Sequence, residues 1–105
     1  MLIDLSEKVI VVTGASRGIG RALALAFARE NAKIVVVYKD SHVLAKTLSE
    51  EINSNNGKCI VVHADVKKKD DVLRLYSVIK KELGRLDVLI NNAGICDFLY
   101  EKTHP

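Results

Sequence analysis

Val9–Gly20, with the sequence VIVVTGASRGIG, is the stretch that decides the fold of this chain. It joins an apolar, β-branched run, Val9–Val12, through a glycine-rich turn to a helix-like run, Ile19–Glu30. Glycine allows a sharp turn and a close approach of the backbone to a ligand, and the first amide N–H groups of a helix attract anions. The order strand, glycine turn, helix therefore predicts a site for a phosphate or pyrophosphate group.

The rest of the chain continues this alternation of strand and helix. Apolar runs at Ile34–Tyr38, Cys59–Val62 and Leu86–Ile90 lack strict alternation, which is typical of strands covered on both faces in a parallel sheet. Because crossovers between parallel strands are right-handed, the first strand should lie in the interior of the sheet. We predict an α/β fold, part of a doubly wound Rossmann sheet, with element order β-α-β-α-β-α-β and strand order 3-2-1-4.

The helices between these strands are predicted from apolar residues spaced three and four positions apart. We expect each set to form the buried stripe of its helix: Ile19, Leu23 and Phe27 in the first, Leu44, Leu48 and Ile52 in the second, and Val72, Tyr76, Ile79 and Leu83 in the third. Turn residues mark the helix ends. We expect Ser41 to cap the second helix, Asn55-Asn56-Gly57 to end it, and Gly84 to form a left-handed cap after the third.

Length and composition limit the class of protein. The chain has 105 residues, 49% of them hydrophobic and 28% charged, which indicates one globular domain. Its longest apolar run is Ala22–Ala28, against the ~20 residues that cross a bilayer, and Asp4 and Glu7 stand where a signal peptide would be apolar. We therefore expect a cytoplasmic protein that does not associate with membranes.

Two further ligand classes are excluded by the side-chain content. The net charge of +3 is mild and aromatic residues make up only 5%, so we expect no nucleic-acid binding. Cys59 and Cys96 lie far apart without a zinc-like spacing. We expect both to be ordinary thiols and predict no metal site.

Two more motifs accompany the glycine turn. Asp65-Val66 follows the third predicted strand, and Asn91-Asn92-Ala93-Gly94 follows the fourth. Together with the spacing of Thr13, Gly14, Gly18 and Gly20, they make the whole chain similar to the short-chain dehydrogenases/reductases. Within that family, residues 14–22 and 86–94 most resemble bacterial-type 3-oxoacyl-carrier-protein reductases and glucose dehydrogenases. The resemblance implies an oxidoreductase that moves hydride between a nicotinamide cofactor and a carbonyl or alcohol.

The resemblance also implies roles for individual residues. Asp65 would contact the adenine amino group, the two asparagines would line the cofactor and stabilise the sheet, and Ala93 and Gly94 would form a thin wall beside the ribose. The predicted cofactor-binding residues are Gly14, Ser16, Arg17, Gly18, Ile19, Gly20, Tyr38, Lys39, Asp65, Val66, Asn91, Asn92, Ala93 and Gly94. Plainer interpretations exist: a tight turn for the glycines, a turn or helix-start carboxylate for Asp65, and a left-handed turn for the asparagines.

The choice of nicotinamide cofactor depends on the end of the second strand, where an acid binds the ribose hydroxyls of NAD and repels a 2′-phosphate. Tyr38 stands at the position of that acid, Lys39 follows it, and Arg17 in the glycine turn can reach the same region. These cations favour NADP. Asp40 is the counter-indication, because a strand end two residues later would give it the role of the acid. We therefore expect NADP as the preferred cofactor and NAD as the alternative.

Catalytic residues are not predicted in this chain. The family resemblance implies a serine and a Tyr-x-x-x-Lys pair well downstream of the Asn-Asn-Ala-Gly motif, and residues 1–105 contain no counterpart. Tyr76 and Lys80 have the four-residue spacing but precede the motif, and we interpret Tyr76 as a core residue of the third helix. We expect residues 1–105 to be the N-terminal part of an NAD(P)-binding domain, incomplete at the C-terminus and inactive alone.

Three functions stay open. We favour the cofactor-binding part of a reductase whose small-molecule substrate requires a longer form. The alternatives are a non-catalytic dinucleotide-binding or regulatory protein, and an interaction module that pairs through the edge of the fourth strand and has no useful cofactor affinity. Ile95–Pro105 shows no clear period, so the edge of the fourth strand would be bare. A bare apolar edge favours pairing with another chain, either a partner or a second copy in a homo-oligomer.

Overall fold

The computed structural model describes residues 4–15 and 18–92 of the chain. Strands and helices alternate as β1 Val9–Thr13, α1 Gly18–Arg29, β2 Lys33–Tyr38, α2 His42–Ser54, β3 Lys58–His63, α3 Lys69–Leu83 and β4 Val88–Asn91. The predicted element order is therefore confirmed. None of the helices in the described ranges is both long and apolar enough to cross a membrane.

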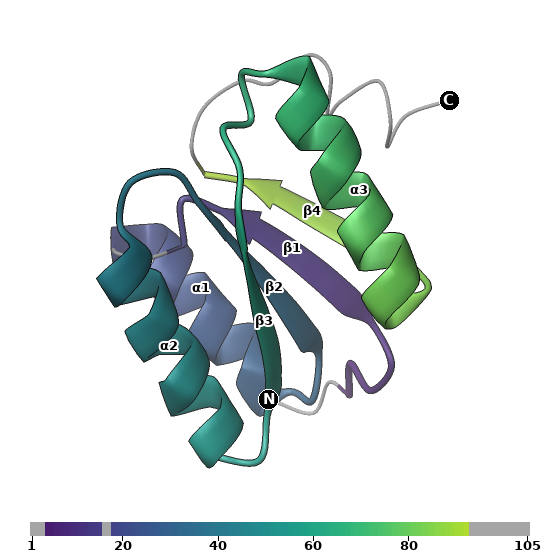
Figure 1. Ribbon diagram of the computed structural model, residues 1–105. Coiled ribbons are helices and arrows are strands. Elements are labelled where there is room, and N and C mark those ends of the chain that lie inside the picture. The colour runs from purple at the N-terminus through teal and green to yellow at the C-terminus, as the bar shows by residue number, and fades with distance from the viewer. Residues whose placement is uncertain (1–3, 16–17, 93–105) are drawn as a thin grey trace.

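The strands form a single parallel sheet with the order β3-β2-β1-β4, which confirms the predicted α/β fold and its strand order (Figure 1). Val11 in β1 is opposite Val35 in β2 and Leu89 in β4, and Val35 is opposite Ile60 in β3. In a parallel sheet all strands finish at the same edge, so the residues that follow β1, β2, β3 and β4 meet there. This edge is where the predicted cofactor site lies.

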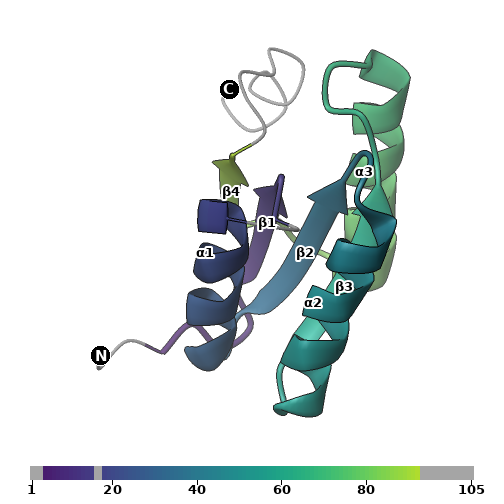
Figure 2. The same ribbon diagram turned by 90° about the vertical axis from the view of Figure 1, so that its left-hand side faces the viewer.

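The hydrophobic core has two layers, one on each face of the sheet. Side chains alternate along β1, so that Val9 and Val11 join the layer beneath α3, and Ile10 and Val12 join the layer beneath α1 and α2. Figure 2 shows the helices on the two faces. Because both faces are covered, all of β1 is buried. This burial explains why apolar and polar residues do not alternate along the strand.

The predicted helix stripes are wrong in several positions. Ile19 is 72% exposed and Leu44 is 43% exposed, whereas Gly20, Ala24 and Ala45 are buried instead. The buried stripe of α1 and α2 is thus shifted by one residue at the helix starts. The physical reason is that small residues let the helix backbone approach the sheet closely, and a search for large apolar side chains misses such a contact surface.

Tyr76 is also not a core residue. Its side chain is 36% exposed, while the neighbouring Leu75 is fully buried against the sheet together with Val72 and Ile79. The apolar residues of α3 fit two overlapping stripes, one through Tyr76 and one through Leu75. The aliphatic stripe through Leu75 faces the sheet. Tyr76 and Lys80 instead line a cavity of about 380 Å³ beside the residues that lead into β4.

The residues predicted to begin and end the helices lie at the helix ends, and all but Ser41 act as expected. Gly84 has φ +78° and donates its N–H to the carbonyls of Ile79 and Lys80, as expected of a left-handed cap. Asn55 is the C-cap of α2, and Asn56 has φ +68°. Ser41 stands at the N-cap position of α2, but its hydroxyl makes no capping hydrogen bond, because its backbone φ and ψ of −104° and 61° differ from the extended geometry typical of a cap.

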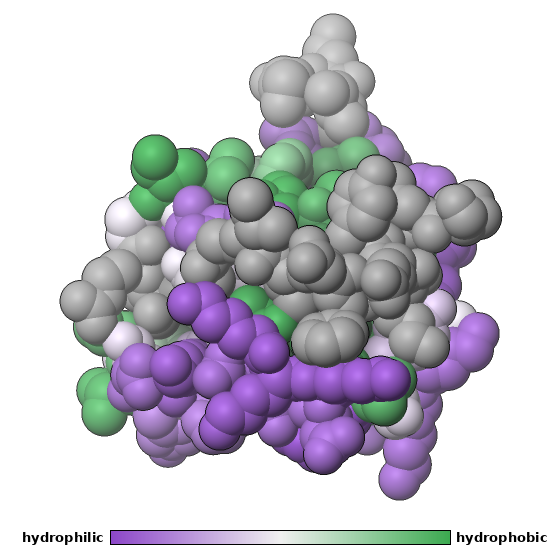
Figure 3. Space-filling model, turned by 90° about the horizontal axis from the view of Figure 1, so that it is seen from above, coloured by the Kyte–Doolittle hydropathy of each residue, from purple (hydrophilic) through white to green (hydrophobic). Residues whose placement is uncertain are grey.

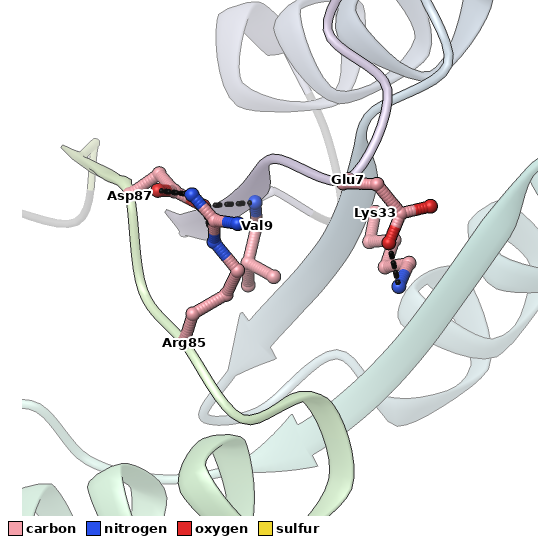
Figure 4. Close-up of polar contacts among 5 residues, drawn as sticks. All are labelled: Glu7, Val9, Lys33, Arg85 and Asp87. Atoms are coloured by element: carbon pink, nitrogen blue, oxygen red, sulfur yellow. Dashed lines mark hydrogen bonds and ion pairs between the residues drawn. The ribbon is translucent and has the colours of Figure 1, made fainter.

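Asp87 connects the start of β4 to the start of β1; the strand begins at Val88, two residues after the start of the predicted run Leu86–Ile90. Its Oδ2 atom accepts hydrogen bonds from the Val9 N–H and from Arg85 Nε, both at 2.8 Å, and its Oδ1 atom accepts one from Arg85 Nη2 at 2.7 Å (Figure 4). The hydrogen bonds from Arg85 and then from Val9 hold the pKa of the Asp87 carboxyl below its ordinary value. Lys33 and Glu7 form a second ion pair at this end of the sheet.

We expect Asp87→Asn to lower the free energy of unfolding near neutral pH by about 1–3 kcal/mol, because the amide lacks the charge and the second acceptor oxygen that face Arg85. The folded pKa of Asp87 is depressed, so its contribution is present above the unfolded pKa of about 3.9 and is lost as the pH falls through the folded pKa. Urea denaturation at neutral and acidic pH measures both effects. Glu50→Gln on the exposed side of α2 is the control, and an equal loss for both variants would contradict the prediction.

Candidate functional site

A cavity of about 400 Å³ lies at the edge where β1, β2 and β3 finish. It is lined by the last residues of β1 and β2 and by the segments that follow β1, β2 and β3, comprising Thr13, Gly14, Val37, Tyr38, Lys39, Asp40, Ser41, Ala64, Asp65, Val66 and Lys67. Figure 3 views the molecule from this end, where hydrophilic side chains form a broad band along one side. A cavity outside the carboxyl ends of parallel strands is the usual place for a ligand in an open α/β sheet.

The glycine turn that follows β1 depends on the conformational freedom of glycine. Gly14 and Gly18 have φ +64°, a region that other residues rarely adopt, and the Gly14 N–H donates to the Val37 carbonyl at 3.1 Å. A Cβ atom on Gly20 would lie 2.5 Å from the Gly14 carbonyl oxygen and 2.7 Å from Asn92 Nδ2. The start of α1 can therefore contact β1 only with glycine at position 20.

The first turn of α1 presents its backbone beside this glycine turn. Gly18, Ile19 and Gly20 begin the helix, and the first N–H groups of an α-helix have no intrahelical acceptor. The exposed Ile19 side chain belongs to this end of the molecule and not to the core. Ser16 and Arg17, which the sequence also assigns to the site, lie outside the described residues.

Asn91 and Asn92 connect the end of β4 to the glycine turn. Thr13 Oγ1 donates a hydrogen bond to Asn91 Oδ1 at 2.9 Å, and Asn92 Nδ2 donates one to the Gly14 carbonyl at 3.2 Å. The two amide side chains thus connect β4 to β1 and to the glycine turn. Ala93 and Gly94 lie outside the described residues.

Tyr38 is the last residue of β2, and its ring is held by two histidines. Tyr38 Oη forms a hydrogen bond with His42 Nδ1 at 2.7 Å, and the Tyr38 ring lies 5.4 Å from the His42 ring and 5.3 Å from the His63 ring, centre to centre. His63 Nε2 is 2.9 Å from the Lys39 carbonyl oxygen. The sequence analysis did not identify the two histidines. His63 ends β3, and the pairing of β2 with β3 places it opposite Tyr38, which becomes apparent only once the register is known. His42 begins α2, shortly after Tyr38 in the chain.

Asp65 and Lys39 face each other across the cavity. Asp65 Oδ1 accepts a hydrogen bond from the Lys67 N–H at 3.0 Å, and Asp65 Oδ2 lies 3.7 Å from Lys39 Nζ. The hydrogen bond from Lys67, followed by the charges of Lys39 and Lys68, holds the pKa of the Asp65 carboxyl below its ordinary value. Asp65 is therefore ionised at neutral pH. Its hydrogen bond from the Lys67 N–H is also the contact expected of a turn carboxylate, the alternative role for Asp65.

The position of Asp40 follows from the end of β2. The strand ends at Tyr38, so Asp40 stands two residues beyond it, on the exposed loop that leads to α2. Both residues line the cavity. The strand end thus coincides with the sequence-based assignment that places Tyr38, and not Asp40, at the strand terminus.

The structure gathers most of the predicted cofactor-binding residues at one edge of the sheet. Gly14, Tyr38, Lys39, Asp65 and Val66 line the same cavity. Gly20 and Asn92 adjoin it through their contacts with Gly14, and Gly18, Ile19 and Asn91 lie next to them in the chain.

Cys59 does not belong to this site. It is buried in β3, and burial raises the pKa of its thiol to about 11, so the thiol stays protonated at neutral pH. This is the environment of an ordinary core thiol. Cys96 lies outside the described residues.

Comparison with known proteins extends the similarity beyond this site. A family model described as short chain dehydrogenase matches residues 8–104. The chain is 46% identical to the 3-oxoacyl-(acyl-carrier-protein) reductase of Synechocystis sp. over 91 residues, which cover 87% of this chain and 37% of that protein.

Two solved structures have the same fold over the matched region. A dehydrogenase/reductase from Sinorhizobium meliloti superimposes with a TM-score of 0.83 and 34% identity, covering 88% of this chain and 36% of that one. A metagenomic short-chain oxidoreductase in complex with NADP superimposes with a TM-score of 0.80 and 35% identity, covering 87% and 41%. The chain spans less than half of the length of each of these relatives. With a family model matched over nearly its whole length, the chain belongs to the short-chain dehydrogenase family.

Proposed function

We propose that this chain is the cofactor-binding portion of an oxidoreductase that transfers hydride between NADP(H) and a carbonyl or alcohol substrate. The observation that carries the proposal is the cavity at the strand ends, where a glycine turn, an ammonium group and an ionised carboxylate meet. A short-chain oxidoreductase of the same fold has been solved in complex with NADP, which supports this class of cofactor.

The residues of the site fit the parts of a nicotinamide dinucleotide. The first-turn amides of α1, from Gly18 to Gly20, would bind the pyrophosphate, and the absence of a Cβ at Gly20 keeps the turn close to the helix. Asp65 and Val66 would bind the adenine, and Asn91 and Asn92 would line the nicotinamide side. Bound NADPH supplies the hydride, and these residues bind and orient the dinucleotide.

The preference for NADP(H) rests on the end of β2. Tyr38 occupies the position at which an acid would bind the ribose hydroxyls of NAD, and the Lys39 ammonium lies in the same cavity. An acid at that position would repel the 2′-phosphate of NADP, whereas a lysine attracts it. We infer that NADP(H) is the preferred cofactor and that NAD(H) binds more weakly.

We expect Lys39→Ala to weaken NADPH binding about tenfold and to leave NADH binding nearly unchanged, because a hydrogen bond to a charged group contributes about 1.5–3 kcal/mol and this one is partly solvated. Isothermal calorimetry with both dinucleotides measures the two constants. Lys46→Ala, on the exposed side of α2, is the matched control. Equal weakening of both dinucleotides would contradict the assignment of Lys39 to the 2′-phosphate.

A second substitution tests the position of Tyr38. We expect Tyr38→Asp to reverse the preference, so that NADH binds more tightly than NADPH, because the new carboxylate would accept hydrogen bonds from the ribose hydroxyls and repel the 2′-phosphate. Tyr38→Asn removes the ring without adding a charge and is the control. If the preference for NADPH over NADH does not change in Tyr38→Asp but changes when the charge of Asp40 is altered, the ribose-binding acid position lies two residues later than proposed.

We propose that residues 1–105 bind the cofactor without turning it over, because they contain no Tyr-x-x-x-Lys pair after Asn91–Asn92. Purified chain should show no carbonyl-dependent oxidation of NADPH above the background rate in an absorbance assay at 340 nm, the wavelength at which NADPH but not NADP absorbs. Turnover that disappears in Tyr76→Phe would show that the exposed Tyr76 and Lys80 pair is catalytic. Stable self-association without dinucleotide binding would instead favour a function in pairing along β4.

A further inference from the structure

In the ion pair between Lys39 and Asp65, hydrogen bonds restrain the aspartate, whereas the lysine side chain is largely exposed and can move. Asp65 is held at three points: Oδ1 accepts from the Lys67 N–H at 3.0 Å, its own N–H donates to Asp71 Oδ2 at 2.8 Å, and its carbonyl accepts from the Lys68 N–H at 2.9 Å. The Asp65 side chain is only 14% exposed. The Lys67 N–H thus restrains the carboxylate, and the two main-chain hydrogen bonds hold the turn from which it extends.

The lysine is arranged in the opposite way. Its backbone carbonyl is anchored to His63 Nε2 at 2.9 Å, but its side chain is 60% exposed and follows the last residue of β2. A lysine side chain carries its charge on a flexible four-carbon stem. The ammonium can thus exchange Asp65 for another anion in the cavity while the main chain and the carboxylate stay in place.

We propose that Asp65 is a specificity-determining residue whose carboxylate competes with the 2′-phosphate of NADP(H) for the Lys39 ammonium, and so limits the preference of this chain for NADP(H) over NAD(H). The inference rests on the proposed function, because it assigns Lys39 to the 2′-phosphate. It adds that Asp65, whose expected contact is with the adenine shared by both cofactors, also acts on the one group that distinguishes them.

The other charges in the cavity do not replace this competition. Lys67 and Asp40 also line it, and Lys68 acts on the Asp65 carboxylate. Asp65 is the carboxylate that lies 3.7 Å from Lys39 Nζ, and its ionisation at neutral pH keeps it a competitor under the conditions of a binding experiment. A partly exposed ion pair is weak, so the effect should be a modest shift of selectivity and not a switch.

Asp65→Asn tests the proposal, because the amide keeps an oxygen that can accept from the Lys67 N–H but removes the charge that attracts Lys39. We expect the ratio of the NADH to the NADPH dissociation constant to rise about two- to fivefold. Calorimetry with both dinucleotides measures the ratio. A change in adenine binding affects both constants equally and cancels in it. Asp70→Asn, an exposed aspartate in the first turn of α3, is the matched control and should leave the ratio unchanged.

A double-mutant cycle separates competition for Lys39 from direct repulsion between Asp65 and the phosphate. In a Lys39→Ala background, Asp65→Asn should no longer raise the ratio. An unchanged or lower ratio in Asp65→Asn, or an equal rise in the Lys39→Ala background, overturns the inference. If Asp65→Asn does not fold, Asp65→Ser keeps a side-chain acceptor for the Lys67 N–H and allows the same comparison.

The outcomes also distinguish this inference from the proposed function. If the unaltered chain binds neither NADPH nor NADH, the proposed function fails and the inference fails with it. If both dinucleotides bind, Lys39→Ala lowers the ratio and Asp65→Asn does not change it, only the role of Asp65 is wrong.

Discussion

Burial of β1 on both faces is the constraint on which the rest of the structure depends. Every residue from Val9 to Thr13 is buried, between β2 and β4 within the sheet and between two apolar layers above and below it. Thr13, the last residue of β1, is the polar residue of the strand, and its hydroxyl donates a hydrogen bond to Asn91 Oδ1. The polar groups of the candidate site therefore come from the strand ends and the segments that follow them, and the parallel arrangement brings these to one edge.

The glycine turn connects the buried strand β1 to the candidate site. Because Gly20 lies against the Gly14 carbonyl and the Asn92 amide, the start of α1 is held directly above the end of β1. The same arrangement orients the first-turn amides of α1 toward the space beyond the strand ends. At the opposite edge of the sheet, Asp87 holds the starts of β1 and β4 together through the Val9 N–H. The two ends of β1 are thus fixed by different chemistry, neutral amides at one and a carboxylate at the other.

Electrostatics at the candidate site depend on a small number of ionised groups. Asp65 is oriented by backbone hydrogen bonds, Lys39 extends from the end of β2, and the ring of Tyr38 contacts the rings of two histidines. Tyr38 is the last residue of β2, the strand end on which the proposed preference for NADP(H) rests. Under the proposed function, competition between the Asp65 carboxylate and a bound phosphate for the Lys39 ammonium would limit the selectivity of the site.

The amino-acid pattern was enough to predict the element order and a parallel sheet, because apolar runs without alternation indicate strands covered on both faces, and right-handed crossovers then restrict the strand order. It also determined which residues follow the strands, and hence five of the residues that line the cavity. Tertiary structure decided which helix residues face the sheet: small residues such as Ala24 and Ala45 are buried while Ile19 is exposed, since close packing favours small volume over hydrophobicity. Only the folded chain pairs Lys39 with Asp65 and Tyr38 with His63, because these contacts join segments 25 or more residues apart that meet through the register of neighbouring parallel strands.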